Sequence, residues 1–296
     1  MTLHSFPKIF AVGTSYIQDL LNGEVEVTEK VDGSQFVFGK INGKILMRSK
    51  GQEIFPESVN KMFATAVEQV LAMEGSLPPG FVYYCEYLQN RKHNVLTYNR
   101  APRKNLALYA VEAEPGSGLF YPYDTLVYEA TQLGIDVVPR LIYGKVTMDD
   151  LKGCLNYESF LGGPKVEGVV VKDYTKKFLI GGQPMPLMAG KLVSDDFKEV
   201  HRKAGNASSA RGSWETFKEG YRTEARWLKA IQHLRDNGTL KGESADIGPL
   251  IREIRKDLSE ECMAEIKAFL WKEFGEYLPK QQQPSLMGSG YEEIGC

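Results

Sequence analysis

The first two thirds of the chain carry a pattern that is typical of β-strands. Short runs rich in residues that favour strands, among them SQFVFGKI, KILMRSK, GFVYYCEYL and NLALYAVEA, are bounded by Gly, Asn, Asp or Pro, which favour turns. Apolar residues recur at three- and four-residue spacing over residues 56–73 and 123–134, which predicts helices there. Up to about residue 199 we therefore expect antiparallel sheets accompanied by helices.

The pattern becomes helical after Val200. The stretch AGNASSARGS is small and polar, as linkers are. Beyond it, the spacing of apolar residues predicts three helices, over residues 213–238, 247–258 and 259–278. We expect the tail from residue 281 to be loosely ordered. The prediction is an α+β fold with a larger domain over residues 1–203, followed by a small all-α domain over residues 204–296.

The composition is that of a globular protein. Hydrophobic residues make up 43% of the 296 residues and charged residues 25%, so the chain can bury a core. The sequence contains no apolar run of the roughly 18 residues that a membrane span needs, and its N-terminus lacks the pattern of a secretory signal. Four scattered cysteines form no C-x-x-C pair, which argues against a zinc site or a disulfide framework and fits a reducing cytoplasm.

Basic residues gather in two places, although the formal net charge is only −2. The first group consists of Arg91, Lys92, His93, Arg100, Arg103 and Lys104. The second group consists of Lys198, His201, Arg202, Lys203 and Arg211. Taken alone, each group can be a solvated loop or a surface that binds the phosphates of a nucleic acid. A near-neutral total leaves both interpretations open, because a basic face can be balanced elsewhere.

A glycine turn at residues 29–34, Glu-Lys-Val-Asp-Gly-Ser, places a lysine beside an acid. The Asn-Gly pair at residues 42–43 predicts a two-residue hairpin, whose returning strand brings Arg48 and Lys50 back toward Lys30. Cations beside such a turn suit a polyphosphate, and they can lower the pKa of a neighbouring amine and so make it a better nucleophile. Alone, the segment can equally be an ordinary hairpin turn.

This segment, followed by Arg-Ser-Lys-Gly at residues 48–51, resembles the covalent nucleotidyltransferases: ATP-dependent DNA ligases, RNA ligases and mRNA capping enzymes. Four later segments resemble further motifs of that superfamily, in the same order: YCEYL at residues 84–88, LYAVE at 108–112, VEGVVVK at 166–172 and GKLV at 190–193. The resemblance covers roughly residues 5–200. It implies a nucleotidyltransferase (ATP-grasp-like ligase) domain of antiparallel sheets with helices.

The resemblance also implies roles for the matched residues. Lys30 would be the nucleophile that takes AMP from ATP, Glu86 would contact the ribose, and Tyr109 would stack on the purine. Glu167 would serve the metal ion, Mg²⁺ or Mn²⁺. The ATP site would further include Glu29, Asp32, Gly33, Arg48, Lys50, Lys172 and Lys191. Relatives usually place a second lysine two residues after the position of Lys191, where this chain has Val193.

Two features favour the RNA ligases of phage type. The Arg-Ser-Lys-Gly segment and the stretch HNVLTY at residues 93–98 are similar to theirs. DNA ligases and capping enzymes carry an OB-fold of short strands after the last motif, whereas this chain reads as helical. The implied reaction joins 5′-phosphate and 3′-hydroxyl ends of RNA through lysyl-AMP and adenylylated-polynucleotide intermediates. Arg91, Lys92, His93, Arg100 and Arg103 would then bind the strand.

Other interpretations stay open at this stage. The chain can be a DNA ligase, a capping-type nucleotidyltransferase, or a non-catalytic nucleic-acid-binding protein of the same fold. As partners we expect RNA, with single-stranded DNA as a further candidate, and no membrane. We expect a monomer in the cytoplasm, that of a host cell if the chain is phage-encoded. We also expect the helical domain to help hold the strand, so that residues 1–203 alone would still form the AMP adduct.

Overall fold

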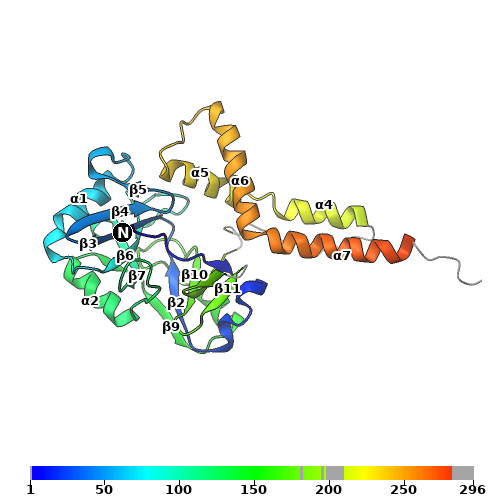
Figure 1. Cartoon of the computed structure of the whole chain (residues 1–296), viewed down its shortest axis with the longest axis horizontal. Coiled ribbons are helices and arrows are strands. Elements are labelled where there is room, and N and C mark those ends of the chain that lie inside the picture. Colours follow the sequence, from blue (N-terminus) through cyan, green and yellow to red (C-terminus); the bar gives the residue numbers. More distant parts are fainter. Residues whose placement is uncertain (1, 181–182, 195–196, 198–209, 282–296) are drawn as a thin grey trace, which may run out of the picture.

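The computed structural model describes residues 2–180, 183–194, 197 and 210–281. Two sheets with their helices form one part of the molecule, and helices near the C-terminus form the other (Figure 1). The α+β prediction is confirmed, including the all-α character of the described residues 210–281. Those residues contain no strand, so an OB-fold is absent from that part of the chain. No helix among the described residues is both long and apolar enough to cross a membrane.

The first sheet has five strands in the order β1-β13-β10-β2-β9. Their bounds are Phe10–Ala11 (β1), Val25–Lys30 (β2), Arg140–Gly144 (β9), Gly168–Asp173 (β10) and Met188–Val193 (β13). Along β2, Val25 and Val27 pack into one core with α3, Met148–Cys154. The alternate residues Glu26, Thr28 and Lys30 share the other face of the strand, as the period of two requires.

The second sheet has six strands in the order β5-β4-β3-β6-β7-β8. Their bounds are Ser34–Ile41 (β3), Lys44–Ser49 (β4), Glu53–Ile54 (β5), Val82–Tyr87 (β6), Leu106–Glu112 (β7) and Asp136–Val137 (β8). The predicted hairpin is confirmed, because Ile41 pairs with Lys44 across the turn. Asn42 and Gly43 both have positive φ, 50° and 75°, as a type I′ turn demands. A separate two-stranded sheet is formed by β11, Phe178–Ile180, and β12, Gln183–Met185.

Helices α1, Ala64–Ala72, and α2, Tyr123–Leu133, pack against the six-stranded sheet and close its main core. The α2 prediction is confirmed, but α1 begins eight residues later than expected. Pro56–Ser58 is a short 3-10 helix, and the extended Val59 follows it. Asn60 then accepts the main-chain N–H of Met62 at 3.1 Å. This local turn competes with the helix, as Asn side chains commonly do.

Four helices make up the described C-terminal part: α4, Ala210–Gly220; α5, Glu224–Asp236; α6, Ile247–Glu261; and α7, Met263–Gln281. The single helix predicted over residues 213–238 is wrong, because Thr223 is extended and its side chain caps α5 by accepting the N–H of Arg226 at 3.3 Å. The third helix, predicted to stop before Pro279, instead runs to Gln281. Helices α4 and α7 lie side by side (Figure 1), with the rings of Phe217 and Phe269 stacked at 3.9 Å.

The predicted domain boundary at residues 203 and 204, the linker up to residue 209 and the tail from residue 282 lie outside the described residues. Contacts between the two parts are nevertheless well defined. The hydroxyl of Ser34 donates to Asp236 of α5 at 2.8 Å, and Asn60 donates to the carbonyl of Arg235 at 3.3 Å. Lys8 donates to the carbonyl of Glu260 at the end of α6. Helix α5 is therefore docked against the turn that follows Lys30.

Candidate active site

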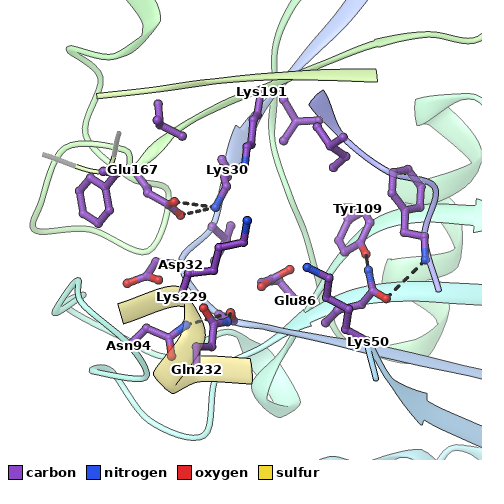
Figure 2. A pocket seen from close by; sticks show the side chains of 18 of the residues that line it. Lys30, Asp32, Lys50, Glu86, Asn94, Tyr109, Glu167, Lys191, Lys229 and Gln232 are labelled. Carbon is purple, nitrogen blue, oxygen red and sulfur yellow. Dashed lines mark hydrogen bonds and ion pairs between the residues drawn. The ribbon is translucent and has the colours of Figure 1, made fainter. Parts of the chain in front are cut away.

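A cavity of about 440 Å³ lies where the two sheets meet, and α5 covers one side of it. The chain crosses from β2 of one sheet to β3 of the other through residues 31–33, so the predicted glycine turn lies at this junction. Figure 2 shows the side chains of Lys30, Glu86, Tyr109 and Lys191 around one space. The volume is within the range of small-molecule sites.

Lys30 and Glu167 form the centre of the cavity. Strand β10 pairs with β2 so that Gly168 faces Lys30, which puts the preceding Glu167 beside the amine. The Nζ atom of Lys30 donates to both oxygens of Glu167 at 2.6 Å. A Cβ atom at Gly168 would lie 2.4 Å from the carbonyl oxygen of Leu192. Only glycine therefore allows β10 and β13 to approach so closely beside the carboxylate.

The pKa of Lys30 is raised, not lowered as the sequence suggested. Burial opposes its charged form, but Glu167 and then Glu86 and Asp32 outweigh that effect. Of the two cations expected to lower this pKa, Arg48 binds the carbonyl of Leu3 instead. The charges that act on Lys30 are those of carboxylates, which raise its pKa. In this state Lys30 is protonated at neutral pH, and its nucleophilic form requires that Glu167 be engaged by another group.

Asp32 and Gly33 shape the turn itself. The Asp32 carboxylate accepts the N–H groups of Val95 and Leu96, both at 2.7 Å, and its own N–H donates to the hydroxyl of Tyr98 at 2.9 Å. A Cβ at Gly33 would lie 2.7 Å from Glu86 and 2.8 Å from the carbonyl of Tyr87. Asp32 therefore holds the HNVLTY stretch in place, and Gly33 allows the turn to pack closely against β6.

Glu86 projects from β6 into the same cavity (Figure 2). Burial raises the pKa of this carboxyl to about 8; Lys30 opposes the shift, and the neighbouring acids Glu167, Asp236 and Asp32 add to it. A protonated carboxyl can donate a hydrogen bond as well as accept one. At neutral pH this side chain is thus suited to a hydroxyl-bearing ligand.

A pH-dependent stability follows from Glu86. Because its folded pKa is about 8 and its ordinary value is 4.5, the unfolded chain loses this proton first as pH rises. The free energy of unfolding therefore falls between pH 4.5 and 8 and is not reduced further by this group above that window. Glu86→Gln should remove the loss, and its stability relative to wild type should grow by about 1–2 kcal/mol from pH 6 to 8.

Urea denaturation of both proteins at pH 6 and 8 measures this difference. Glu114→Gln, a change at an exposed glutamate outside the cavity, is the matched control and should follow wild type. Parallel stability losses in wild type and Glu86→Gln over this window would show that Glu86 is ionised in the folded state.

Tyr109 and Lys172 form the inner wall at the far end of the cavity from Glu167. The Tyr109 hydroxyl accepts a hydrogen bond from Gln35 at 3.0 Å, and its ring meets the edge of Phe6 at 5.2 Å. Lys172 is 1% exposed; its Nζ donates to the Tyr109 carbonyl at 2.8 Å and lies 3.5 Å from Glu26. Burial lowers the pKa of Lys172, and Glu26 partly offsets this effect. This end of the cavity is therefore aromatic, and its polar groups are bound within the protein.

Lys191 and Lys50 approach the cavity from opposite sides (Figure 2). Lys191 is carried by β13, which pairs with both β1 and β10 and is therefore held firmly. Val193 lines the cavity two residues further along the same strand. Lys50 follows directly after β4 and also lines the cavity.

Two residues of the predicted ATP site, Glu29 and Arg48, have their charged groups bound to other parts of the fold, although Glu29 also lines the cavity. The Glu29 carboxylate accepts hydrogen bonds from the Ser159 hydroxyl at 2.5 Å and the Phe160 N–H at 3.0 Å, so it anchors that loop. Arg48 donates to the carbonyl of Leu3 at 2.7 Å and to that of its neighbour Ser49 at 3.0 Å. Its guanidinium holds the N-terminal segment against β4 and does not line the cavity.

The residues predicted to bind the strand are divided by the structure. Arg91 and Lys92 are exposed. His93 instead lies under α5, where its ring nitrogen Nε2 is 2.9 Å from the Ser34 hydroxyl and burial lowers its pKa to about 4. Arg100 and Arg103 both bind the carboxylate of Asp136, at 2.5 and 2.7 Å. Only the first pair therefore presents cations that no described acid engages at salt-bridge distance.

Several cavity residues were not predicted from the sequence. They are Lys229, Gln232, His233 and Asp236 of α5, together with the N-terminal segment at residues 6–9. Gln232 donates to the carbonyl of Gly33 at 2.6 Å, and burial raises the pKa of Asp236 to about 7 although its bond to Ser34 opposes the shift. A signal was present: polar residues at three- and four-residue spacing on one face of α5. That pattern is also typical of a solvated helix face, so it did not identify a site.

The cavity lies in the two-sheet part of the chain, and the all-α part lies beside it. The profile of the family described as RNA ligase matches residues 23–183, more than half of the 296 residues. The chain belongs to the RNA ligase family.

Among solved structures, the chain is similar to the Naegleria gruberi RNA ligase with PPi, at 17% identity and a TM-score of 0.44, over 66% of this chain and 59% of that one. A variant of that enzyme with ATP and Mn is 14% identical, with a TM-score of 0.46, over 65% of this chain and 56% of that one. A putative ATP-dependent DNA ligase from Aquifex aeolicus is 14% identical, with a TM-score of 0.45, over 86% of this chain and 66% of that one. The chain thus spans less than two thirds of the Naegleria enzyme. No curated protein matches it.

Proposed function

We propose that this chain is an ATP-dependent RNA ligase that joins 5′-phosphate and 3′-hydroxyl ends through a lysyl-AMP at Lys30. The observation that carries the proposal is the position of Lys30. Its amine lies in a cavity of about 440 Å³, between an acidic partner, Glu167, and an aromatic end at Tyr109. Membership of the RNA ligase family supports the same reaction class.

In the first step, Lys30 Nζ attacks the α-phosphorus of ATP after losing a proton. An N–P bond forms, the bond from this phosphorus to the oxygen bridging to the β-phosphate breaks, and pyrophosphate leaves with that electron pair. Tyr109 stacks on the purine, and protonated Glu86 binds the ribose. Lys191 neutralises charge on the α-phosphate, which is the largest kind of contribution that a protein makes to such a transfer.

A divalent metal ion, Mg²⁺ or Mn²⁺, fits this site only together with the nucleotide. No three His, Cys, Asp or Glu groups of the described residues converge as metal ligands. Glu167 is the carboxylate that would hold the ion, with phosphate oxygens as the other ligands, which suits a hard cation. When bound, the ion neutralises phosphate charge. Release of Glu167 from Lys30 also removes the interaction that keeps the amine protonated.

In the later steps AMP passes to the 5′-phosphate of the strand, and the 3′-hydroxyl of the other end displaces it. We propose that Arg91 and Lys92 contact the backbone of that strand, since exposed cations bind phosphates without sequence preference. RNA is the proposed partner, single-stranded DNA a further one, and the chain acts as a monomer. Its domains are proposed as residues 1–203 and 204–296.

The proposal is tested by incubation with labelled ATP and a panel of 5′-phosphorylated RNA and DNA strands, with and without a complementary splint. We expect a labelled protein–AMP adduct, followed by sealed RNA. An adduct with sealing of nicked DNA alone would favour the DNA ligase interpretation. The absence of any adduct would refute the proposal and favour a non-catalytic nucleic-acid-binding protein.

Glu167→Gln should slow adenylylation on the order of 10²-fold, the loss typical of one electrostatic contact to a reacting group. The variant keeps the shape of the side chain, but a neutral amide binds a metal ion poorly and cannot form an ion pair with Lys30. Single-turnover labelling with ATP measures the rate, and Glu114→Gln should leave it unchanged. A wild-type rate in Glu167→Gln would mean that the motif around Gly168 has been misassigned.

A further inference from the structure

Helix α5 covers the mouth of the cavity and contacts the glycine turn directly. Gln232 donates to the Gly33 carbonyl at 2.6 Å, and Asp236 accepts from Ser34 at 2.8 Å. Both bonds join the helical part to the segment that carries Lys30. The helical part therefore forms a wall of the nucleotide cavity, and these two hydrogen bonds fix the position of α5 relative to Lys30.

Lys229 is the cation that α5 contributes to this wall. Figure 2 shows it extending into the same space as Lys30 and Lys191. Its Nζ lies 2.5 Å from Asp257 and 3.0 Å from Glu261. The buried Asp257 belongs to α6, which packs beside α5, so this pair holds the lysine stem toward the cavity.

Glu261 connects Lys229 with Lys191. One oxygen of its carboxylate lies 3.0 Å from Lys229 Nζ, and the other lies 4.0 Å from Lys191 Nζ. A single anionic group is thus shared between a lysine of the sheets and a lysine of the helical part. A phosphate group has the same charge and more acceptor oxygens, so the same pair of cations can bind it.

Lys50 adds a third cation to this end of the cavity. Lys50 lines the cavity, and its Nζ atom lies 3.3 Å from the Nε2 atom of His233 on α5. Desolvation lowers the pKa of Lys50, and the like charges of Lys229 and Lys191 lower it further, while Glu261 and Asp257 oppose the shift. Three ammonium groups that repel one another, with Glu261 between two of them, are stabilised by any polyanion that enters. The aromatic purine end lies at Tyr109, so this cluster faces the triphosphate of a bound nucleotide.

We propose that Lys229, acting with Lys50, binds the β- and γ-phosphates of ATP and the pyrophosphate that leaves, so that the helical part completes the site for adenylylation. This inference deepens the proposed function and rests on it. It also supplies the charge that Val193 lacks, since Lys172 is bound to Glu26 and Tyr109. It differs from the expectation that the helical part acts mainly on the strand.

The test is Lys229→Met, which keeps the length of the side chain and removes its charge. Adenylylation with labelled ATP should fall on the order of 10²-fold. Sealing of a strand that already carries 5′-AMP should stay within about twofold of wild type, because no pyrophosphate takes part in it. Lys229→Arg should recover most of the adenylylation rate. Lys256→Met, at an exposed lysine of α6, is the matched control and should change neither reaction.

Titration calorimetry with inorganic pyrophosphate gives a readout that does not depend on activity. Lys229→Met should weaken pyrophosphate binding at least tenfold, and Lys256→Met should not. Wild-type adenylylation in Lys229→Met, unchanged pyrophosphate binding, or an equal loss of adenylylation and of pre-adenylylated sealing would each overturn the inference. Failure of the wild-type chain to form any adduct would instead overturn the proposed function.

Discussion

Lys30→Ala should form no protein–AMP adduct at all. Lys30 is the residue whose amine donates to both oxygens of Glu167 at the junction of the two sheets, and a methyl group cannot attack phosphorus. Labelling with ATP followed by peptide mapping measures the result, with the label of the wild-type protein expected on the peptide that contains Lys30. The variant should still seal strands that carry 5′-AMP, because that step needs no lysyl-AMP.

Removal of Lys30 leaves the Glu167 carboxylate, 10% exposed, without its cation, which costs stability. Lys30→Arg separates this effect from the chemistry. A guanidinium keeps the positive charge, but it stays protonated and is not a nucleophile. It should fold like wild type and form no adduct, whereas Lys44→Ala, at an exposed lysine of the same hairpin, should label normally. An adduct in Lys30→Arg would place the nucleophile elsewhere.

The ion pair between Lys30 and Glu167 has a consequence for the order of events. While Glu167 keeps the amine of Lys30 protonated, the amine is not nucleophilic and cannot react with electrophiles that enter the cavity from solvent. In the proposed reaction, Glu167 and the phosphate oxygens of an entering ATP would hold a metal ion, and the carboxylate would then be less available to the amine of Lys30. Burial then favours the neutral form of Lys30, opposed only by the smaller effects of Glu86 and Asp32. Reactivity thus depends on the filled site.

Local chemistry made the sheets and the centre of the site predictable. The Asn-Gly turn at residues 42–43 fixes the register of β3 and β4, and the Asp-Gly turn after Lys30 marks the crossing between sheets. Strand periodicity also indicates that the side chain of Glu29 lies on the opposite face of the strand from that of Lys30, because neighbours along a strand point to opposite faces. That Glu29 binds Ser159 and Arg48 binds Leu3 depends on contacts across the fold that no local pattern encodes.

The contribution of the helical part could not be predicted for the same reason. Lys229 and Gln232 are ordinary residues for a solvated helix face, and only the docking of α5 onto Gly33 gives them another role. The basic group at residues 91–103 illustrates the opposite case. Arg100 and Arg103 were predicted to bind the strand, and the parallel pairing of β7 with β8 brings Asp136 to both of them. Bunched charge alone does not separate these outcomes.

Lys191→Ala should reduce adenylylation on the order of 10³-fold, the upper end of the loss for one charge-assisted contact to a developing phosphoryl charge. Lys191 is carried by β13, which pairs with strands on both sides, so the sheet determines where its ammonium group lies. Single-turnover labelling measures the rate, and Lys145→Ala, at an exposed lysine, should not alter it. A near-silent Lys191→Ala would show that the final motif has been placed on the wrong lysine.

Val193→Lys should bring no gain in the wild-type background, because Lys229 and Lys50 already supply the charge that relatives place on this strand. Val193 lines the cavity on the same face of β13 as Lys191, so a lysine there can reach the phosphates. The same substitution should therefore restore at least tenfold of the adenylylation lost in Lys229→Met. A large gain from Val193→Lys alone would show that the charge is missing in the natural chain, and no rescue in the double variant would show that Lys229 and position 193 act on different groups.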